Sequence, residues 1–327
     1  MSSSGSYNFT VTRDQLITDA LLHIGAIGEG ETPSANAVTE AARLLNMMVK
    51  LRAAIGMPAW ALKRGTILPV TGVSSVTSIS HIVTTYDHTT LSAAEAASQT
   101  VLSVTDSTGM TAADQIGIAL DDGTMHWTTI VSVDSAVQIT VTTAIPTAAS
   151  SGAHVYAYTA STDRIQRPLR IIEANILAVT SDESWSIEVT DRSTYYASGN
   201  RTIAGVPNTI YYEGGLGTGT ADPSTATTWY GTVFISPRFS GGDNVIEFTY
   251  HRPFQDFDAS GDHPDFPQEF YLPLMLELAA LSGPRYGVAI DERKSLFIEA
   301  KMYLEEALST VYSEGSIKIQ PDDDSGA

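Results

Sequence analysis

The sequence predicts an α+β protein, with a helical bundle formed by the N- and C-terminal helices and with inserted antiparallel β-sandwich or barrel modules. Two observations carry this prediction: apolar residues recur at helical spacing at both chain ends, and short β-branched runs fill the middle. We expect four parts: an N-terminal helical part of the bundle at 1–64, an acidic inserted β module at 65–163, a second β region at 164–255, and C-terminal helices with an extended arm at 256–327.

The first part contains two amphipathic helices between residues 14 and 60, joined by a glycine-containing connector at residues 28–34. Thr32 suits the N-cap of the second helix and Pro33 its first helical position. Gly56, just before Met57 and Pro58, marks the end of that helix. The segment therefore predicts a helical hairpin, and it offers no catalytic group.

The acidic module is defined by charge. Residues 65–163 contain eight acids and no Lys or Arg, which gives a net charge of −8. So abrupt a change in composition suggests an inserted module. Its β-branched runs are separated by turn-forming Asp, Ser and Gly, which predicts a small antiparallel sandwich or barrel.

Strand-like runs continue from residue 164, where Arg recurs, and they predict a second β unit. We expect loops at 193–199 and 214–219, because their Gly residues suit positive φ. The 214–219 loop lacks the Lys and the following helix that a phosphate-binding loop needs.

The last part predicts two helices. Pro273 fits the first of them only within its opening turns, and Asp291 can cap the second. Packing these helices against the N-terminal pair would complete the bundle. The predicted apolar stripes are Phe270, Leu274, Leu278 and Leu281 on the first helix, and Leu296, Ala300, Tyr303, Ala307, Leu308 and Val311 on the second.

Composition limits the classes of function. An apolar content of 43% is enough for a sizeable core, and the absence of Cys excludes disulfides and thiol chemistry. A net charge of −19 disfavours tight binding to phosphates, although it is compatible with a conduit that holds DNA weakly. No apolar run is long enough to span a membrane, so we expect neither a signal peptide nor a membrane anchor.

The sequence predicts no enzyme, no cofactor and no metal. Its seven His show no ligand spacing, and no Gly-x-Ser-x-Gly elbow occurs. Residues 256–262 match the first half of a calcium loop, but Pro267 occupies the position that needs a bidentate Glu. Whether this segment binds a cation or only forms an acidic linker stays open.

Arg164, Arg167 and Arg170 form a basic cluster at the end of the acidic module. We hypothesise that they meet acids of a neighbouring copy or line a channel. The alternative is ordinary solvated charge with intrachain pairs.

The helix pair at residues 14–60, taken together with the aromatic and proline-rich start and two helices at residues 265–321, resembles the head-to-tail adaptors of tailed phages. These connector or tail accessory proteins, of the packaged-DNA-stabilisation type, lie beneath the portal. The likeness covers about the first 65 residues and the C-terminal stretch. It does not extend to the middle, where the long β insertion departs from shorter adaptors.

The resemblance implies a non-enzymatic structural virion protein that joins portal to tail as a ring, by resemblance a dodecamer. Its partners would be the portal protein, a tail or nozzle protein and further copies of itself. Double-stranded DNA would pass through the lumen without sequence-specific binding or a role for membranes. The protein would lie in the neck or tail of the virion, and in the host cytoplasm during assembly.

In such adaptors the C-terminal arm reaches the portal. Residues 316–319 alternate like a strand, which could add to a partner. The implied portal-contact residues are Glu314, Gly315, Ser316, Ile317, Lys318, Ile319, Gln320 and Pro321.

The competing prediction is a phage decoration or tail binding module, whose β-sandwich recognises another protein or a host glycan. Exposed aromatic residues would serve such recognition, although filling the core is their commoner role. The candidates are Trp127, Tyr156, Tyr158, Trp185, Tyr195 and Tyr196.

Overall fold

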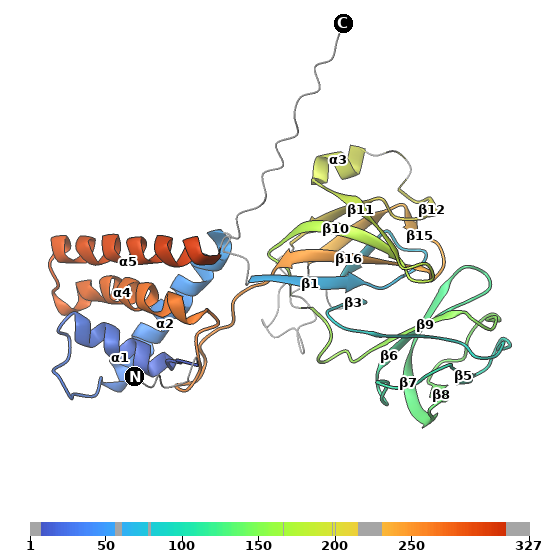
Figure 1. The fold of residues 1–327 in the computed structure, drawn as a ribbon, viewed down its shortest axis with the longest axis horizontal. Helices are drawn as coiled ribbons and strands as arrows, with labels where there is room; N and C mark the ends of the chain where they lie inside the picture. The colour runs from blue at the N-terminus through green and yellow to red at the C-terminus, as the bar shows by residue number, and fades with distance from the viewer. Residues whose placement is uncertain are drawn as a thin grey trace, which may run out of the picture. The chain divides into compact units, whose positions relative to one another are not determined.

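The computed structural model describes residues 8–55, 61–77, 80–165, 167–197, 199, 201–214 and 231–311. The chain divides into two compact units. Met1–Ala61 and Phe254–Ala327 form a helical unit, and Leu62–Pro253 form a β unit. The predicted mixture of helices and curled antiparallel sheets is confirmed (Figure 1).

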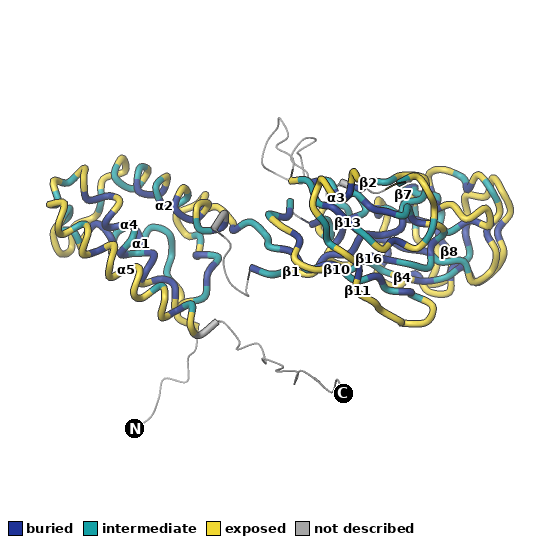
Figure 2. Tube along the Cα trace, turned by 90° about the horizontal axis from the view of Figure 1, so that it is seen from above, coloured by how far each residue is buried: buried dark blue, intermediate teal, exposed yellow. Residues whose placement is uncertain are grey.

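The helical unit contains α1 (Arg13–His23), α2 (Ala35–Ile55), α4 (Tyr271–Ser282) and α5 (Ile290–Val311). Helix α4 is apolar around most of its circumference and contacts each of the other three. A helix of this composition is stable only when it is surrounded. In the view of Figure 2, helices α2 and α5 lie at opposite edges of the unit, with α1 and α4 between them. None of the described helices is long and apolar enough to cross a membrane.

Two predicted helix starts were wrong by a few residues. Helix α2 begins at Ala35, because the Ser34 Oγ accepts a hydrogen bond from the Ala37 amide at 3.3 Å and takes the capping role predicted for Thr32. Helix α5 begins at Ile290, so Asp291 lies in its first turn and is not the N-cap. There the positive end of the helix dipole stabilises its carboxylate. Gly56 lies outside the described residues.

The larger sheet of the β unit has the strand order β2-β14-β13-β11-β10-β16-β1-β3. Its neighbours are antiparallel except for β11 and β13. Isoleucines dominate its core. The strands are β1 (Leu62–Ile67), β2 (Ser75–Thr77), β3 (Ile82–Val83), β10 (Arg170–Ala178), β11 (Glu183–Thr190), β13 (Thr209–Glu213), β14 (Thr232–Ser236) and β16 (Asn244–His251), beside the small pair β12 (Ala204–Gly205) and β15 (Arg238–Phe239).

The smaller sheet is antiparallel throughout, in the order β4-β9-β6-β7-β8-β5. An additional bridge between Leu91 and Val104 joins the chain just after β4 to the chain just after β5, so the sheet curls towards closure around its own apolar core. This shape is consistent with a sandwich or barrel. The strands are β4 (Asp87–Thr90), β5 (Val101–Ser103), β6 (Gln115–Ala119), β7 (Met125–Ser135), β8 (Gln138–Val141) and β9 (His154–Tyr158).

The six-stranded sheet is formed by only part of the Lys- and Arg-free segment at residues 65–163. Strands β1, β2 and β3 fall at or within the start of that segment, yet they belong to the larger sheet, where β1 pairs along its length with β16. The predicted loop at 193–199 was also wrong in part, because helix α3 (Arg192–Ala197) forms there. Asp191 Oδ1 accepts from the Thr194 amide at 2.8 Å, and the Tyr195 side chain is buried below the helix.

Candidate assembly surface of the helical unit

Helix α2 carries apolar residues on two faces. One face is buried in the unit and includes Leu45 and Val49. The other includes Met47 and Leu51, which are 55% and 61% exposed and lie one turn apart. Two exposed apolar side chains one turn apart form a patch, which we take as a candidate contact surface.

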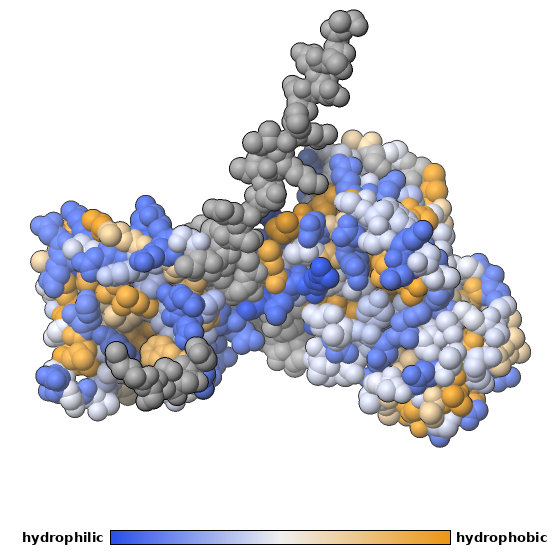
Figure 3. Space-filling view, in the orientation of Figure 1, coloured by the Kyte–Doolittle hydropathy of each residue, from blue (hydrophilic) through white to orange (hydrophobic). Residues whose placement is uncertain are grey.

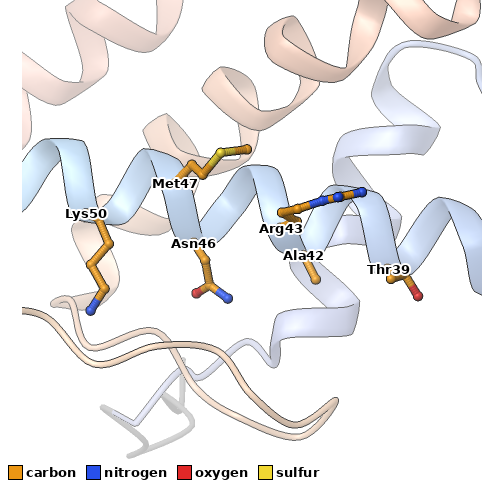
Figure 4. Close-up of a pocket in the computed structure, with 6 residues that line it drawn as sticks. All are labelled: Thr39, Ala42, Arg43, Asn46, Met47 and Lys50. Atoms are coloured by element: carbon orange, nitrogen blue, oxygen red, sulfur yellow. The ribbon is translucent and has the colours of Figure 1, made fainter. Parts of the chain in front are cut away.

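The polar side chains beside Met47 are occupied within the chain. Asn46 Nδ2 donates to the Phe257 carbonyl at 3.2 Å, and Asn46 Oδ1 accepts from the Phe257 amide at 2.9 Å. Lys50 Nζ donates to the Phe254 carbonyl at 2.7 Å and pairs with Asp256 at 2.8 Å. Asn46 and Lys50 point to one side of α2 and Met47 to another (Figure 4).

These contacts bear on the partial calcium loop at residues 256–262. Asp256 faces Lys50, and Asp262 Oδ2 accepts from the amides of Asp258 and Ala259 at 2.8 and 2.6 Å. Across the described residues, no group of three or more His, Asp or Glu could hold a metal ion. The contacts of Asn46 and Lys50 hold residues 254–257 against α2.

A groove of about 560 Å³ runs from Met47 towards the end of α4. Leu44 and Leu281 contribute apolar walls, and Arg285 forms an ion pair with Glu40 at its side. The Met47 face of α2 is therefore hollowed as well as apolar. Hydrophobic residues also reach the surface on another face of the helical unit, the one seen in the space-filling view (Figure 3).

Helix α5, like α2, carries apolar residues on two faces, one buried and one exposed. Leu296 and Ala300 are buried, whereas Ile298 and Met302 are 61% and 63% exposed. At 100° per residue, positions 298 and 302 project from the side opposite the buried stripe. The regular rotation of the helix therefore places Ile298 and Met302 on the outside, without any local distortion of the backbone.

The two helices differ in charge. Helix α2 carries three bases and one acid, a net charge of +2. Two of these bases are paired within the chain, Lys50 with Asp256 and Arg52 with Glu277, whereas Arg43 makes no ion pair with any described residue. Helix α5 carries five acids and three bases, a net charge of −2. Two of its bases are engaged by acids of the same helix, in the pairs Lys294 with Asp291 and Lys301 with Glu305.

The predicted arginine cluster lies in the β unit, in three different surroundings. The Arg164 guanidinium is 6.0 Å from the centre of the Tyr158 ring. Arg167 counteracts the burial that raises the pKa of Tyr212, and Arg170 faces His251 in the ladder between β10 and β16. An inter-subunit or channel role for these residues stays a prediction. The predicted portal-contact residues 314–321 lie outside the described residues.

The aromatic candidates for recognition separate by burial. Tyr156, Tyr158 and Tyr195 are buried and fill cores, whereas Trp185 and Tyr196 are 42% and 44% exposed. The guanidinium groups of Arg201 and Arg192 lie 4.7 and 5.6 Å from the centre of the Tyr196 ring. Trp127 is half-buried, and its indole Nε1 donates to the Pro69 carbonyl at 3.0 Å.

Sequence reasoning missed Met47, Leu51, Ile298 and Met302. The available signal was a second i, i+4 apolar pair on each helix, outside the stripe assigned to the core. Comparison with known proteins adds nothing to this geometry, because no protein-family model and no curated protein matches the chain.

Proposed function

We propose that this protein is a structural subunit that assembles head to tail with copies of itself, α2 of one copy against α5 of the next. The observation that carries the proposal is the pair of exposed apolar faces on α2 and α5, two helices of opposite net charge that lie at opposite edges of the helical unit in the view of Figure 2. A contact between two different surfaces of one chain repeats from copy to copy and closes into a ring when its rotation permits. The four helices would act as a bundle that forms the body of the ring.

The resemblance to head-to-tail adaptors supplies the context of this ring. We propose that it joins the portal to the tail or nozzle of a phage virion, with twelve copies and a lumen for double-stranded DNA. The net charge of −19 supports a conduit, because few Lys and Arg are present to hold phosphates. The proposed activity is therefore mechanical and not catalytic.

Co-sedimentation with the cognate portal tests the proposal. The full chain should pellet with portal at a fixed ratio, and Met47→Glu should lower that ratio because a buried charge at the contact is costly. Val137→Glu is the matched control, since Val137 is also exposed but lies beside β8 in the smaller sheet. Equal recovery of wild type and Met47→Glu would refute the α2 contact, and failure of wild type to bind portal would refute the adaptor role.

The second candidate function is a decoration or tail binding module. Exposed Trp185 and Tyr196, the latter flanked by two arginines, favour it. A Trp185→Ala/Tyr196→Ala variant distinguishes the two functions. An adaptor should still bind portal, whereas a recognition module should lose its protein or glycan partner.

A further inference from the structure

Strand β11 has a partner along only part of one of its two edges. Strand β10 pairs with residues 183–187 of β11, whereas β13 pairs only with residues 188–190. The chain that precedes β13 does not continue along β11, because Ala204 and Gly205 pair with β15 instead. On the side opposite β10, residues 183–187 of β11 therefore have no described strand beside them.

Two serines of this open edge present their backbone groups outwards. The Glu188 amide donates to the Asn208 carbonyl at 2.9 Å, on the β13 side of β11. Backbone groups two residues apart along a strand point to the same side, so Ser184 and Ser186 direct their N–H and C=O groups away from β10. No described residue forms a backbone hydrogen bond with them on that side. Such unpaired groups are a template for a further strand.

The two faces of the open edge differ in character. Ile187 is buried in the isoleucine-rich core of the larger sheet, and Trp185, on the same face, is 42% exposed. Ser184, Ser186 and Glu188 are exposed on the opposite face. A strand that fits this edge therefore needs apolar residues on one face and polar residues on the other.

The segment Ser316-Ile317-Lys318-Ile319 has this pattern in the sequence, and it lies outside the described residues. As a strand beside β11, it would place Ile317 and Ile319 next to Trp185 and so cover the exposed indole. Residues 312–315 separate the segment from the end of α5 at Val311, which gives it a reach of up to about 17 Å from that helix. The chain therefore carries its own candidate strand of the required composition.

Charge favours the same segment. Lys318 would lie on the face of Ser186, where Glu188 is a diagonal cross-strand neighbour within reach of a long side chain. Glu188 forms no ion pair with a described residue, so Lys318 would give it a counterion. An acidic strand would instead meet Glu183 and Glu188 with like charge, which is destabilising.

We propose that residues 316–319 of one copy add as a strand to the open edge of β11 in another copy. Main-chain hydrogen bonds to Ser184 and Ser186 supply the affinity, and the alternation of Ile with Ser and Lys decides which face of the added strand covers Trp185. This contact goes beyond the proposed pairing of α2 with α5, because it uses neither of the exposed helix faces. It also differs from the portal contact that the resemblance implies for the same residues.

Disulfide trapping between full-length chains tests the contact, because the sequence has no Cys of its own. One variant carries Ser184→Cys and the other Ser316→Cys, and both carry Met47→Glu so that the result does not depend on the α2–α5 contact. Opposite residues of neighbouring strands have Cα atoms about 4.5–5.5 Å apart, within the range of a disulfide. The mixture, mildly oxidised, should give cross-linked heterodimers, identified by mass after a non-reducing gel.

Glu183→Cys is the matched control for Ser184→Cys. Glu183 is the adjacent residue and is also exposed, but its side chain lies on the opposite face of β11. An added strand should cross-link Ser316→Cys to position 184 several times more than to position 183, whereas a segment that collides at random reacts equally with both. Equal yields would overturn the proposal, as would the absence of heterodimers, the result expected if only the portal binds this segment.

A second pair of variants tests the backbone hydrogen bonds. In the Ser184→Cys chain, Ser186→Pro removes the amide that faces the open side and leaves the bonds to β10, whereas Ser186→Ala keeps that amide. Cross-linking to Ser316→Cys should fall several-fold with Pro and persist with Ala. Equal yields from two folded variants would show that the segment does not pair with this edge. If the Pro variant fails to fold, the comparison of positions 183 and 184 still decides.

Discussion

At the scale of single residues, the helical unit depends on the Asn46 side chain, which binds both backbone groups of Phe257. We expect Asn46→Ala to lower the free energy of unfolding of this unit by about 1–3 kcal/mol, since two half-buried backbone groups lose their partner. Denaturant unfolding followed by circular dichroism at 222 nm measures this free energy. Thr39→Ala, on an exposed position of the same helix, should change it by less than about 0.5 kcal/mol. Equal losses of unfolding free energy in the two variants would show that the Asn46 side chain does not stabilise the unit through Phe257.

Gly242 is a second residue with a defined steric role. Gly242→Ala should destabilise the β unit by about 1–3 kcal/mol, because the added methyl overlaps Ala119 and Met125. Gly261→Ala serves as the control, because a Cβ there meets nothing within 4 Å and its φ is not positive. A Gly242→Ala variant as stable as wild type in chemical denaturation would show that Gly242 is loosely packed against Ala119 and Met125.

His81 gives the stability of the β unit a pH dependence whose sign is fixed. Its pKa falls from 6.5 to about 4 on folding, so the unfolded chain binds more protons between these values. The contribution of His81 to stability is therefore fully present above pH 6.5 and is lost progressively as the pH falls towards 4. Urea midpoints measured at several pH values should show this slope, and His81→Asn should flatten it. An unchanged slope in the variant would assign the dependence to other groups.

At the scale of elements, a head-to-tail contact between α2 and α5 predicts how a mixture of two variants, each with one damaged face, behaves. Met47→Glu damages only the α2 face and Ile298→Glu only the α5 face, so each variant alone should fail to assemble on portal. Mixed together they retain one intact pair of faces and should form dimers, detectable by sedimentation velocity. Dimers of either variant alone would indicate a self-complementary contact and would contradict the proposed α2–α5 pairing.

The sequence predicted these elements unevenly. Periodicity located the terminal helices, but the predicted buried stripes were wrong at Leu281 and Tyr303, which are 36% and 43% exposed. It missed α3, since a six-residue helix has too little intrinsic stability to leave a pattern and depends on Tyr195 packing against Tyr211 and Phe234. The charge boundary at residue 65 did not reveal that β1 pairs with β16, because that pairing joins residues far apart in the chain.

At the scale of the whole molecule, both chain ends contribute to one unit, and the β unit lies between them in sequence. This arrangement lets an insertion grow without disturbing the helices that carry the proposed contacts. The joint unit was expected from the apolar stripes on the helices at both chain ends, whereas the contacts between the two sheets were not, because their residues occur at unrelated positions in the sequence. Only the fold brings His88, His154 and Asp243 together.

The central claim is that this chain forms a ring on a portal, and negative-stain electron microscopy tests it most directly. The purified full chain should be imaged alone and after mixing with its cognate portal. We predict rings that stack coaxially on the portal and disappear when Met47→Glu replaces the wild type. Monomers that ignore the portal would contradict the adaptor account and favour the binding module.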